Sequence, residues 1–91
     1  MNDDPVLEQL RDQITDTDRA IVAAINKRLE LVAEVKAYKE SLGIGFLDPA
    51  REQWMLDYLT RANQGPLSSE GLRELFETIL DLSKREVTKS D

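Results

Sequence analysis

The stretch from Val6 to Leu42 reads VLEQLRDQITDTDRAIVAAINKRLELVAEVKAYKESL and contains neither glycine nor proline. Its apolar residues recur at steps of three and four, the spacing of an amphipathic α-helix. They are Leu7, Leu10, Ile14, Ile21, Ile25, Val32, Val35 and Leu42. At 1.5 Å per residue this helix is roughly 55 Å long, whereas a compact domain of this size is about 30 Å across. We therefore expect a second copy of the chain to cover part of the helix, in a twofold homodimer with paired long helices.

Two cations, Arg28 and Lys39, lie on this apolar stripe. They are separated by about three full helical turns, so both side chains leave the same face. A cation on a face meant for burial is costly unless an anion pairs with it. That anion is a ligand or a glutamate of a partner chain; in a further alternative, the two cations extend to the solvated rim of a coiled coil. Arg11 points roughly 100° away from Arg28 and by itself suggests a solvated arginine, yet in an antiparallel pair of helices it can reach a site built by the partner.

The composition excludes several kinds of chemistry. The chain has 91 residues, no cysteine and no histidine. We expect a single domain over residues 1–91, without disulfides, thiol chemistry or the commonest general base and metal ligand. The formal charge of -6 argues against nucleic acid and anionic membranes as partners. No apolar run is long enough to span a membrane, and Met1 to Asp4 lacks the features of a secretory signal, so we expect a cytoplasmic location.

Two shorter helices are predicted after the long one. Gly43 marks the end of the first helix, and Asp48-Pro49 is a strong start signal for a second helix that runs to about Ala62. The third helix opens at Ser68 or Ser69 and carries its own apolar stripe. Strand-like alternation is absent from the sequence. The predicted fold class is therefore all-α, with three helices of which one is very long.

Several residues of the shorter helices are candidates for a binding site. Asp48, Arg51 and Glu52 cluster in the first turn of the second helix. They are either a cap, a surface arginine and an acid that suits the helix dipole, or a site in which Arg51 holds a carboxylate. Ser83 lies on the apolar stripe of the third helix, where a serine more often bonds back to a carbonyl than to a ligand. Trp54 is interpreted as a core or interface residue. Together with the cations of the long helix, these residues suggest a cationic pocket for a small dianion, with no nucleophile–base pair, no metal cluster and no glycine-rich phosphate loop.

The order and spacing of five segments resemble those of a known family. The segments are Leu10-Arg11 with Ile14 and Asp18, Lys27–Leu31, Val35–Lys39, Asp48–Glu52, and Leu75–Leu80 leading to Ser83. This pattern, which covers nearly the whole chain, resembles the all-helical chorismate mutases of the AroQ type. The resemblance implies an intertwined homodimeric helical bundle with two equivalent sites. It also implies the Claisen rearrangement of chorismate to prephenate, without a cofactor, on the route to phenylalanine and tyrosine.

The resemblance further implies roles for the cations of the long helix. Arg28 would bind the enolpyruvyl carboxylate, joined by Arg11 from the other protomer. Lys39 would donate a hydrogen bond to the ether oxygen, where negative charge grows as the C–O bond breaks.

The resemblance assigns the remaining candidates to the ring of the substrate. Arg51 and Ser83 would lie near the ring carboxylate. Glu52 and the region of Asp48 would hold the ring hydroxyl.

One position departs from the family pattern. Four residues after Ser83 the family usually has Gln or Glu as a second partner of the ether oxygen, and here that residue is Val87, which cannot donate. Either Lys39 works alone, or a water or Glu86 takes over, or the substrate differs. Relatives with this fold rearrange 4-amino-4-deoxychorismate or eliminate pyruvate from isochorismate, and the acids of the second helix would suit an amine. A hypothesis of another class, allowed by the long helix alone, is a non-catalytic helical dimerisation module.

Overall fold

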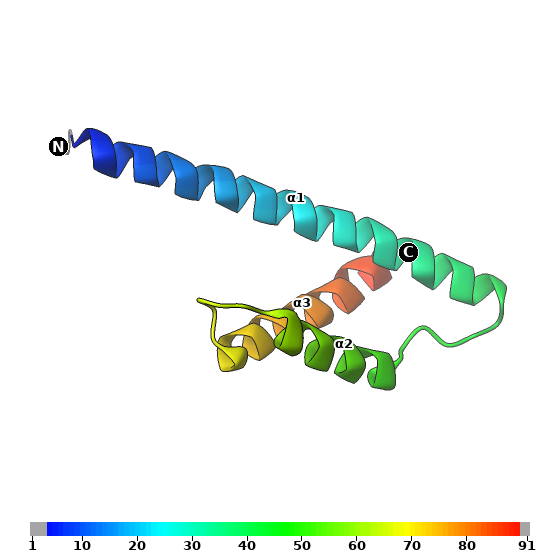
Figure 1. Ribbon diagram of the computed structural model, residues 1–91. Helices are drawn as coiled ribbons and strands as arrows, with labels where there is room; N and C mark the ends of the chain where they lie inside the picture. Colours follow the sequence, from blue (N-terminus) through cyan, green and yellow to red (C-terminus); the bar gives the residue numbers. More distant parts are fainter. Residues whose placement is uncertain (1–3, 90–91) are drawn as a thin grey trace. The chain divides into compact units, whose positions relative to one another are not determined.

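The computed structural model describes residues 4–89, which form three α-helices (Figure 1). The helices are α1 (Pro5–Ser41), α2 (Pro49–Ala62) and α3 (Ser69–Lys89). No strand occurs in these described residues, so the all-α prediction is confirmed, and each predicted end of the long helix is shifted by one residue. Within the same range no helix is long and apolar enough to cross a membrane. Met1 to Asp3, which entered the argument about targeting, lie outside the described residues.

Side-chain caps determine where α1 and α2 begin. The Asp4 Oδ1 atom accepts hydrogen bonds from the backbone N–H groups of Val6 at 2.9 Å and Leu7 at 3.3 Å. The Asp48 Oδ1 atom accepts one from the backbone N–H of Arg51 at 3.1 Å, and a proline follows this cap. Each cap satisfies donors that the first turn of a helix leaves without an internal partner. The start signal predicted at Asp48-Pro49 is confirmed.

The end of α1 is a Schellman turn at Gly43, whose φ of 71° lies in the left-handed region. The Gly43 N–H donates to the Glu40 carbonyl at 3.1 Å, and the Ile44 N–H donates to the Lys39 carbonyl at 2.9 Å. These two bonds satisfy carbonyls that the last turn of the helix leaves free. Glycine adopts this φ without the clash that a β-carbon adds, so the predicted stop signal is confirmed.

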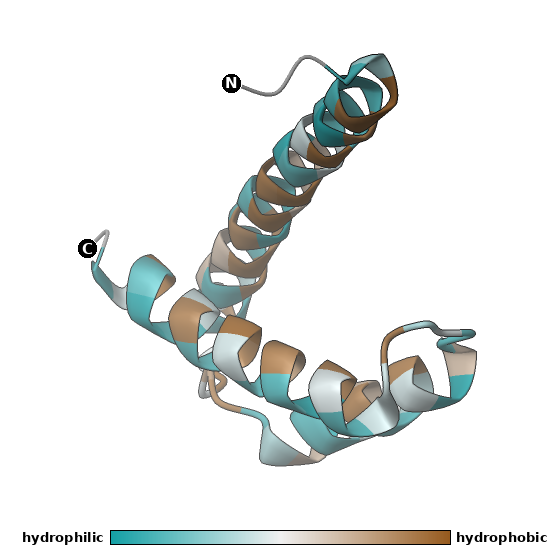
Figure 2. Cartoon of the chain, turned by 90° about the vertical axis from the view of Figure 1, so that its left-hand side faces the viewer, coloured by the Kyte–Doolittle hydropathy of each residue, from teal (hydrophilic) through white to brown (hydrophobic). Residues whose placement is uncertain are grey.

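The chain divides into two compact units, Met1–Leu31 and Val32–Asp91, each described here by itself. The first unit contains most of α1, and none of the residues of α1, all of them described, is buried. Most of its large apolar side chains are exposed, with exposed fractions of 50% for Leu10, 60% for Ile14 and 54% for Ile21, whereas Leu7 and Ile25 are partly buried. Figure 2 shows apolar residues, in brown, recurring along α1. The predicted apolar stripe is therefore present and exposed.

In the second unit, α2 and α3 pack against each other as a helical hairpin, and α3 runs back along α2 (Figure 1). Most buried residues come from α3: Leu72, Ile79, Leu80, Ser83 and Val87, with Leu56 from α2. The two helices are also joined by an ion pair of 2.9 Å between Asp57 and Arg73. The hydrogen bond from the Arg73 guanidinium lowers the pKa of the Asp57 carboxyl below its usual value.

Candidate active site

Lys39, the predicted catalytic lysine, lies in the last turn of α1 with its side chain partly buried. Its Nζ donates a hydrogen bond to the Phe46 carbonyl at 3.1 Å. Its own carbonyl accepts the Ile44 N–H of the Schellman turn. The loop between α1 and α2 therefore holds both the backbone and the ammonium of this residue. Because an ammonium has three donors, Lys39 can keep this bond and still donate to a ligand.

Asp48 and Arg51 lie in the loop-proximal turn of α2. The Asp48 carboxylate caps the helix, as its structural interpretation predicted. The Arg51 guanidinium lies 4.2 Å above the ring of Trp54, which stacks in turn on Tyr58 at 5.2 Å between centroids. Stacking on an aromatic face orients the planar guanidinium while leaving its N–H donors at the rim available for a carboxylate. Trp54 is 47% exposed, so its interpretation as a core residue of this chain is wrong, and a place in an interface stays a prediction.

Glu52 reaches from α2 to α3, where it pairs with Lys84. The Lys84 Nζ atom lies 3.3 Å from Glu52 Oε1 and 3.2 Å from Oε2. Lys84 also approaches Asp81 on its own helix at 3.8 Å. This ion pair is a side-chain contact between α2 and α3. Arg51, Glu52, Trp54 and Lys84 are referred to as the cluster.

Ser83 and Val87 are both buried on α3, one turn apart, with exposed fractions of 4% and 5%. The Ser83 hydroxyl donates to the Ile79 carbonyl at 2.7 Å, which is the back-bonding that the structural interpretation predicted. Its oxygen keeps acceptor capacity while it donates. The Val87 side chain is apolar and buried, so it adds no hydrogen-bond donor to the cluster.

Arg11 and Arg28, the predicted carboxylate-binding residues of α1, belong to the first unit. The Arg28 side chain is partly buried, whereas Arg11 is exposed. Exposure of Arg11 is what a role across a subunit interface requires, because its guanidinium has to reach another chain. The roles of both residues stay predictions.

Two contacts of the cluster had not been predicted. Arg51 and Trp54 are three residues apart on one helix. Side chains at this spacing are neighbours on the helix surface, so the sequence contained a signal for this contact. Glu52 and Lys84 are 32 residues apart, and no local pattern pairs them. Only the packing of α3 on α2 makes that ion pair.

The chemistry available to the second unit is charge stabilisation. Lys39 and Arg51 supply fixed cations, and Glu52 supplies a carboxylate already paired with an ammonium. Such groups hold an anionic ligand in one conformation and stabilise charge that develops on it. They do not form a nucleophile–base pair.

Comparison with known proteins gives consistent matches. A family model described as chorismate mutase type II matches residues 10–87. The structure is similar to that of a chorismate mutase (form II) from Thermus thermophilus, with a TM-score of 0.87 and 34% identity, covering 93% of this chain and 97% of that chain. A second solved form of the mutase from that organism gives a TM-score of 0.82 at 36% identity, covering 85% of this chain and 96% of that one.

One longer relative is similar over most of this chain. It is the bifunctional chorismate mutase/prephenate dehydratase of Pseudomonas aeruginosa, 33% identical in an alignment of 85 residues that covers 88% of this chain and 23% of that protein. The T-protein of Enterobacter agglomerans is 48% identical over 50 residues, which are 55% of this chain and 13% of that protein. The chain therefore spans less than a quarter of the length of these two relatives.

Proposed function

This chain belongs to the type II chorismate mutase family, and from that premise we propose that it catalyses the Claisen rearrangement of chorismate to prephenate. The observation that carries the proposal is the extent of the family match. Residues 10–87 include every candidate residue from Arg11 to Val87. We propose further that residues 1–91 form a single domain of this family.

The proposed site clamps the two carboxylates of the substrate. Arg28, with Arg11 of the partner subunit, binds the enolpyruvyl carboxylate, and Arg51 with Ser83 lies near the ring carboxylate. The rearrangement is unimolecular, so its barrier falls when the two ends of the substrate are held close together in a chair-like shape. The stacking of Arg51 on Trp54 supports this role, because it keeps the guanidinium in one orientation before the substrate arrives.

The electrostatic part of the proposal rests on Lys39. As the C–O bond breaks, the ether oxygen gains negative charge, which a fixed ammonium stabilises. Val87 offers no second donor, and the Glu86 carboxylate pairs with Lys89 at 3.6 Å. These two observations support Lys39 acting without help from Glu86.

The proposed enzyme is a homodimer. The support is the exposure of the apolar stripe along α1, which a second copy of the same helix would cover. Arg11 then comes from the partner subunit, so a single chain lacks part of its site. The cytoplasmic location expected from the sequence stays a prediction.

Chorismate is the favoured substrate because the matched solved structures are named chorismate mutases. The rearrangement of 4-amino-4-deoxychorismate and the lyase reaction on isochorismate are the alternatives on the same fold. A non-catalytic dimerisation module predicts that chorismate leaves the melting temperature unchanged, whereas a ligand that binds only the folded state raises it.

The test is incubation of the purified protein with chorismate, following the loss of the diene absorbance and identifying the product by NMR. Prephenate formed at an enzymatic rate is the expected result. Absence of reaction with chorismate, together with turnover of the amino analogue or isochorismate, would contradict the proposal. A parallel assay of all three compounds therefore separates the hypotheses.

A further inference from the structure

The ion pair between Glu52 and Lys84 places a cation at the part of the proposed site that holds the ring substituent. Both side chains are partly buried, with exposed fractions of 30% for Glu52 and 33% for Lys84, so water screens the pair only in part. The Lys84 Nζ atom donates a hydrogen bond to Glu52 Oε1 at 3.3 Å and lies 3.2 Å from Glu52 Oε2. Lys84 thus compensates the negative charge of Glu52 before any ligand binds, while the second carboxylate near Lys84, that of Asp81 at 3.8 Å, is 80% exposed and screened by water.

The charge compensation by Lys84 changes which ring substituent the Glu52 carboxylate accepts. A carboxylate has about four lone-pair sites, so Glu52 can accept a hydrogen bond from a ring hydroxyl while it keeps Lys84. A hydroxyl is neutral and introduces no charge. An ammonium in the same place would lie within a few ångströms of the Lys84 ammonium, and the two like charges would repel each other.

We propose that Lys84 is a specificity-determining residue that acts through Glu52, so that this end of the site accepts a ring hydroxyl and rejects a ring ammonium. The inference rests on the proposed function, which puts the ring substituent at Glu52. Chorismate is then selected over 4-amino-4-deoxychorismate in two ways. Glu52 accepts a hydrogen bond from the ring hydroxyl, and Lys84 repels a ring ammonium. The ion pair also weakens the case for an amine at Glu52, because Lys84 compensates the negative charge that would attract one.

The experiment compares kcat/KM for chorismate and for 4-amino-4-deoxychorismate in the wild type and in variants of residue 84. Lys84→Met removes the charge and keeps much of the volume, and we expect it to shift the ratio of the two values about tenfold towards the amino compound. Lys84→Gln is a second neutral variant, which keeps a polar end on the side chain. Lys84→Arg keeps the charge, and we expect it to keep the wild-type ratio.

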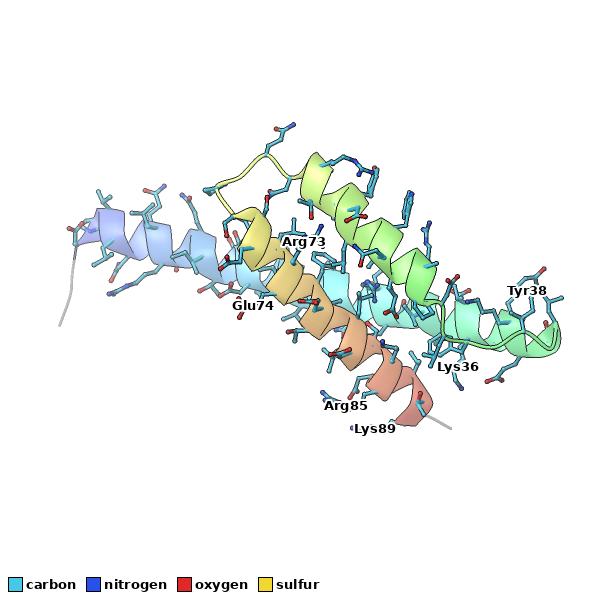
Figure 3. All side chains as sticks on the ribbon, turned by 90° about the horizontal axis from the view of Figure 1, so that it is seen from below. Lys36, Tyr38, Arg73, Glu74, Arg85 and Lys89 are labelled. Carbon is cyan, nitrogen blue, oxygen red and sulfur yellow. The ribbon has the colours of Figure 1, made fainter. Side chains whose placement is uncertain are left out.

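A matched control is Lys89→Met, which removes a cation from the same helix without touching Glu52. Lys89, labelled near the C-terminal end of α3 in Figure 3, is 71% exposed and pairs with Glu86. We expect this variant to leave the substrate ratio unchanged. A loss of thermal stability in Lys84→Met with an unchanged ratio would show a purely structural ion pair and would overturn the inference.

The outcomes separate this inference from the proposed function. A wild-type protein that turns over neither compound overturns the proposed function and this inference with it. A wild type that turns over chorismate, with neutral variants that keep its preference, overturns this inference alone. A wild type that prefers the amino compound also overturns it.

Discussion

At the scale of single residues, Lys39 is the proposed catalytic group of a chain that has neither histidine nor cysteine. A unimolecular rearrangement needs no general base, so a fixed positive charge next to the breaking bond is sufficient. The loop carbonyl of Phe46 holds that charge in place at 3.1 Å from Nζ. The proposed mechanism requires the Lys39 ammonium to be held in one place, and the end of α1 with its loop holds it there.

Replacing Lys39 with Ala should lower kcat by about a hundredfold or more, because one preorganised donor to the developing charge is removed. Steady-state turnover of chorismate measures the effect, and far-ultraviolet circular dichroism checks that helicity is kept. Lys27→Ala, which removes an exposed cation of the same helix, is the control and should keep turnover near the wild-type value. Full activity in Lys39→Ala would end the mechanism as proposed.

At the scale of elements, the end of α1 and the packing of α3 on α2 position the candidate residues. The Schellman turn at Gly43 stops α1 directly after the turn that carries Lys39. The hairpin of α2 and α3 brings Glu52 next to Lys84 and is tied by the Asp57–Arg73 ion pair. The turn at Gly43 and the Asp57–Arg73 ion pair can therefore be tested separately from the candidate site residues.

Gly43→Ala should lower the free energy of unfolding by about 1 kcal/mol, because a residue with a β-carbon is strained at a φ of 71°. Gly45→Ala is the matched control. A β-carbon at either glycine meets no atom within 4 Å, and of the two only Gly43 has a positive φ. Chemical denaturation of both variants measures the difference, and equal costs would show that the conformation of Gly43 is not the cause.

The Asp57–Arg73 ion pair should make stability depend on pH at the acidic end. The pKa of Asp57 is lower in the folded chain than its ordinary value, mainly through the hydrogen bond from Arg73. The contribution of the Asp57 carboxylate to the free energy of unfolding is therefore fully present above its ordinary pKa. It is lost as the pH falls through the lowered pKa of the folded chain. We expect Asp57→Asn to have a lower Tm than the wild type at neutral pH, with the gap shrinking as the pH falls through that range. Arg73→Met should reproduce the pattern, and a gap that stays constant with pH would contradict it.

At the scale of the whole molecule, the exposed stripe of α1 and the exposed Arg11 lead to the same proposal. Leu10 and Ile14 flank Arg11 in sequence and are at least half exposed. A second chain that covers them also receives the guanidinium of Arg11. Dimerisation and completion of the site are therefore one event in this proposal.

Co-expression of two inactive variants tests the shared site. Arg11→Ala and Lys39→Ala protomers, each defective alone, should together recover about a quarter of wild-type activity, because half of randomly formed dimers are mixed and each mixed dimer has one intact site. The control pair is Lys39→Ala with Arg51→Ala. In the proposed site Lys39 and Arg51 come from the same protomer. Neither site of a mixed dimer is then intact, so this mixture should recover no activity. Recovery in neither mixture would contradict the assignment of Arg11 to the partner subunit.

Much of the fold could be read from the sequence because it is encoded locally. The spacing of apolar residues predicted three helices, and Gly43 and Asp48 marked helix ends to within about a residue, since caps and turns depend on neighbours in the chain. The alternative interpretations of Asp48 as a cap and Ser83 as a back-bonding serine are local in the same sense, and the structure has both contacts. The family resemblance, which rests on ordered short segments, is confirmed by the match over residues 10–87.

Two other features were not specified by the sequence: one was decided by tertiary structure, which joins residues far apart in the chain, and one by side-chain conformation on a helix surface. The sequence by itself determined the helices, their ends, the cations of α1 and the family. It did not pair Glu52 with Lys84 or place the exposed Trp54 under Arg51. The first of these contacts exists because α3 folds back on α2 and brings together side chains 32 residues apart. The second follows from the rotamers that a helix surface allows, which spacing alone does not specify.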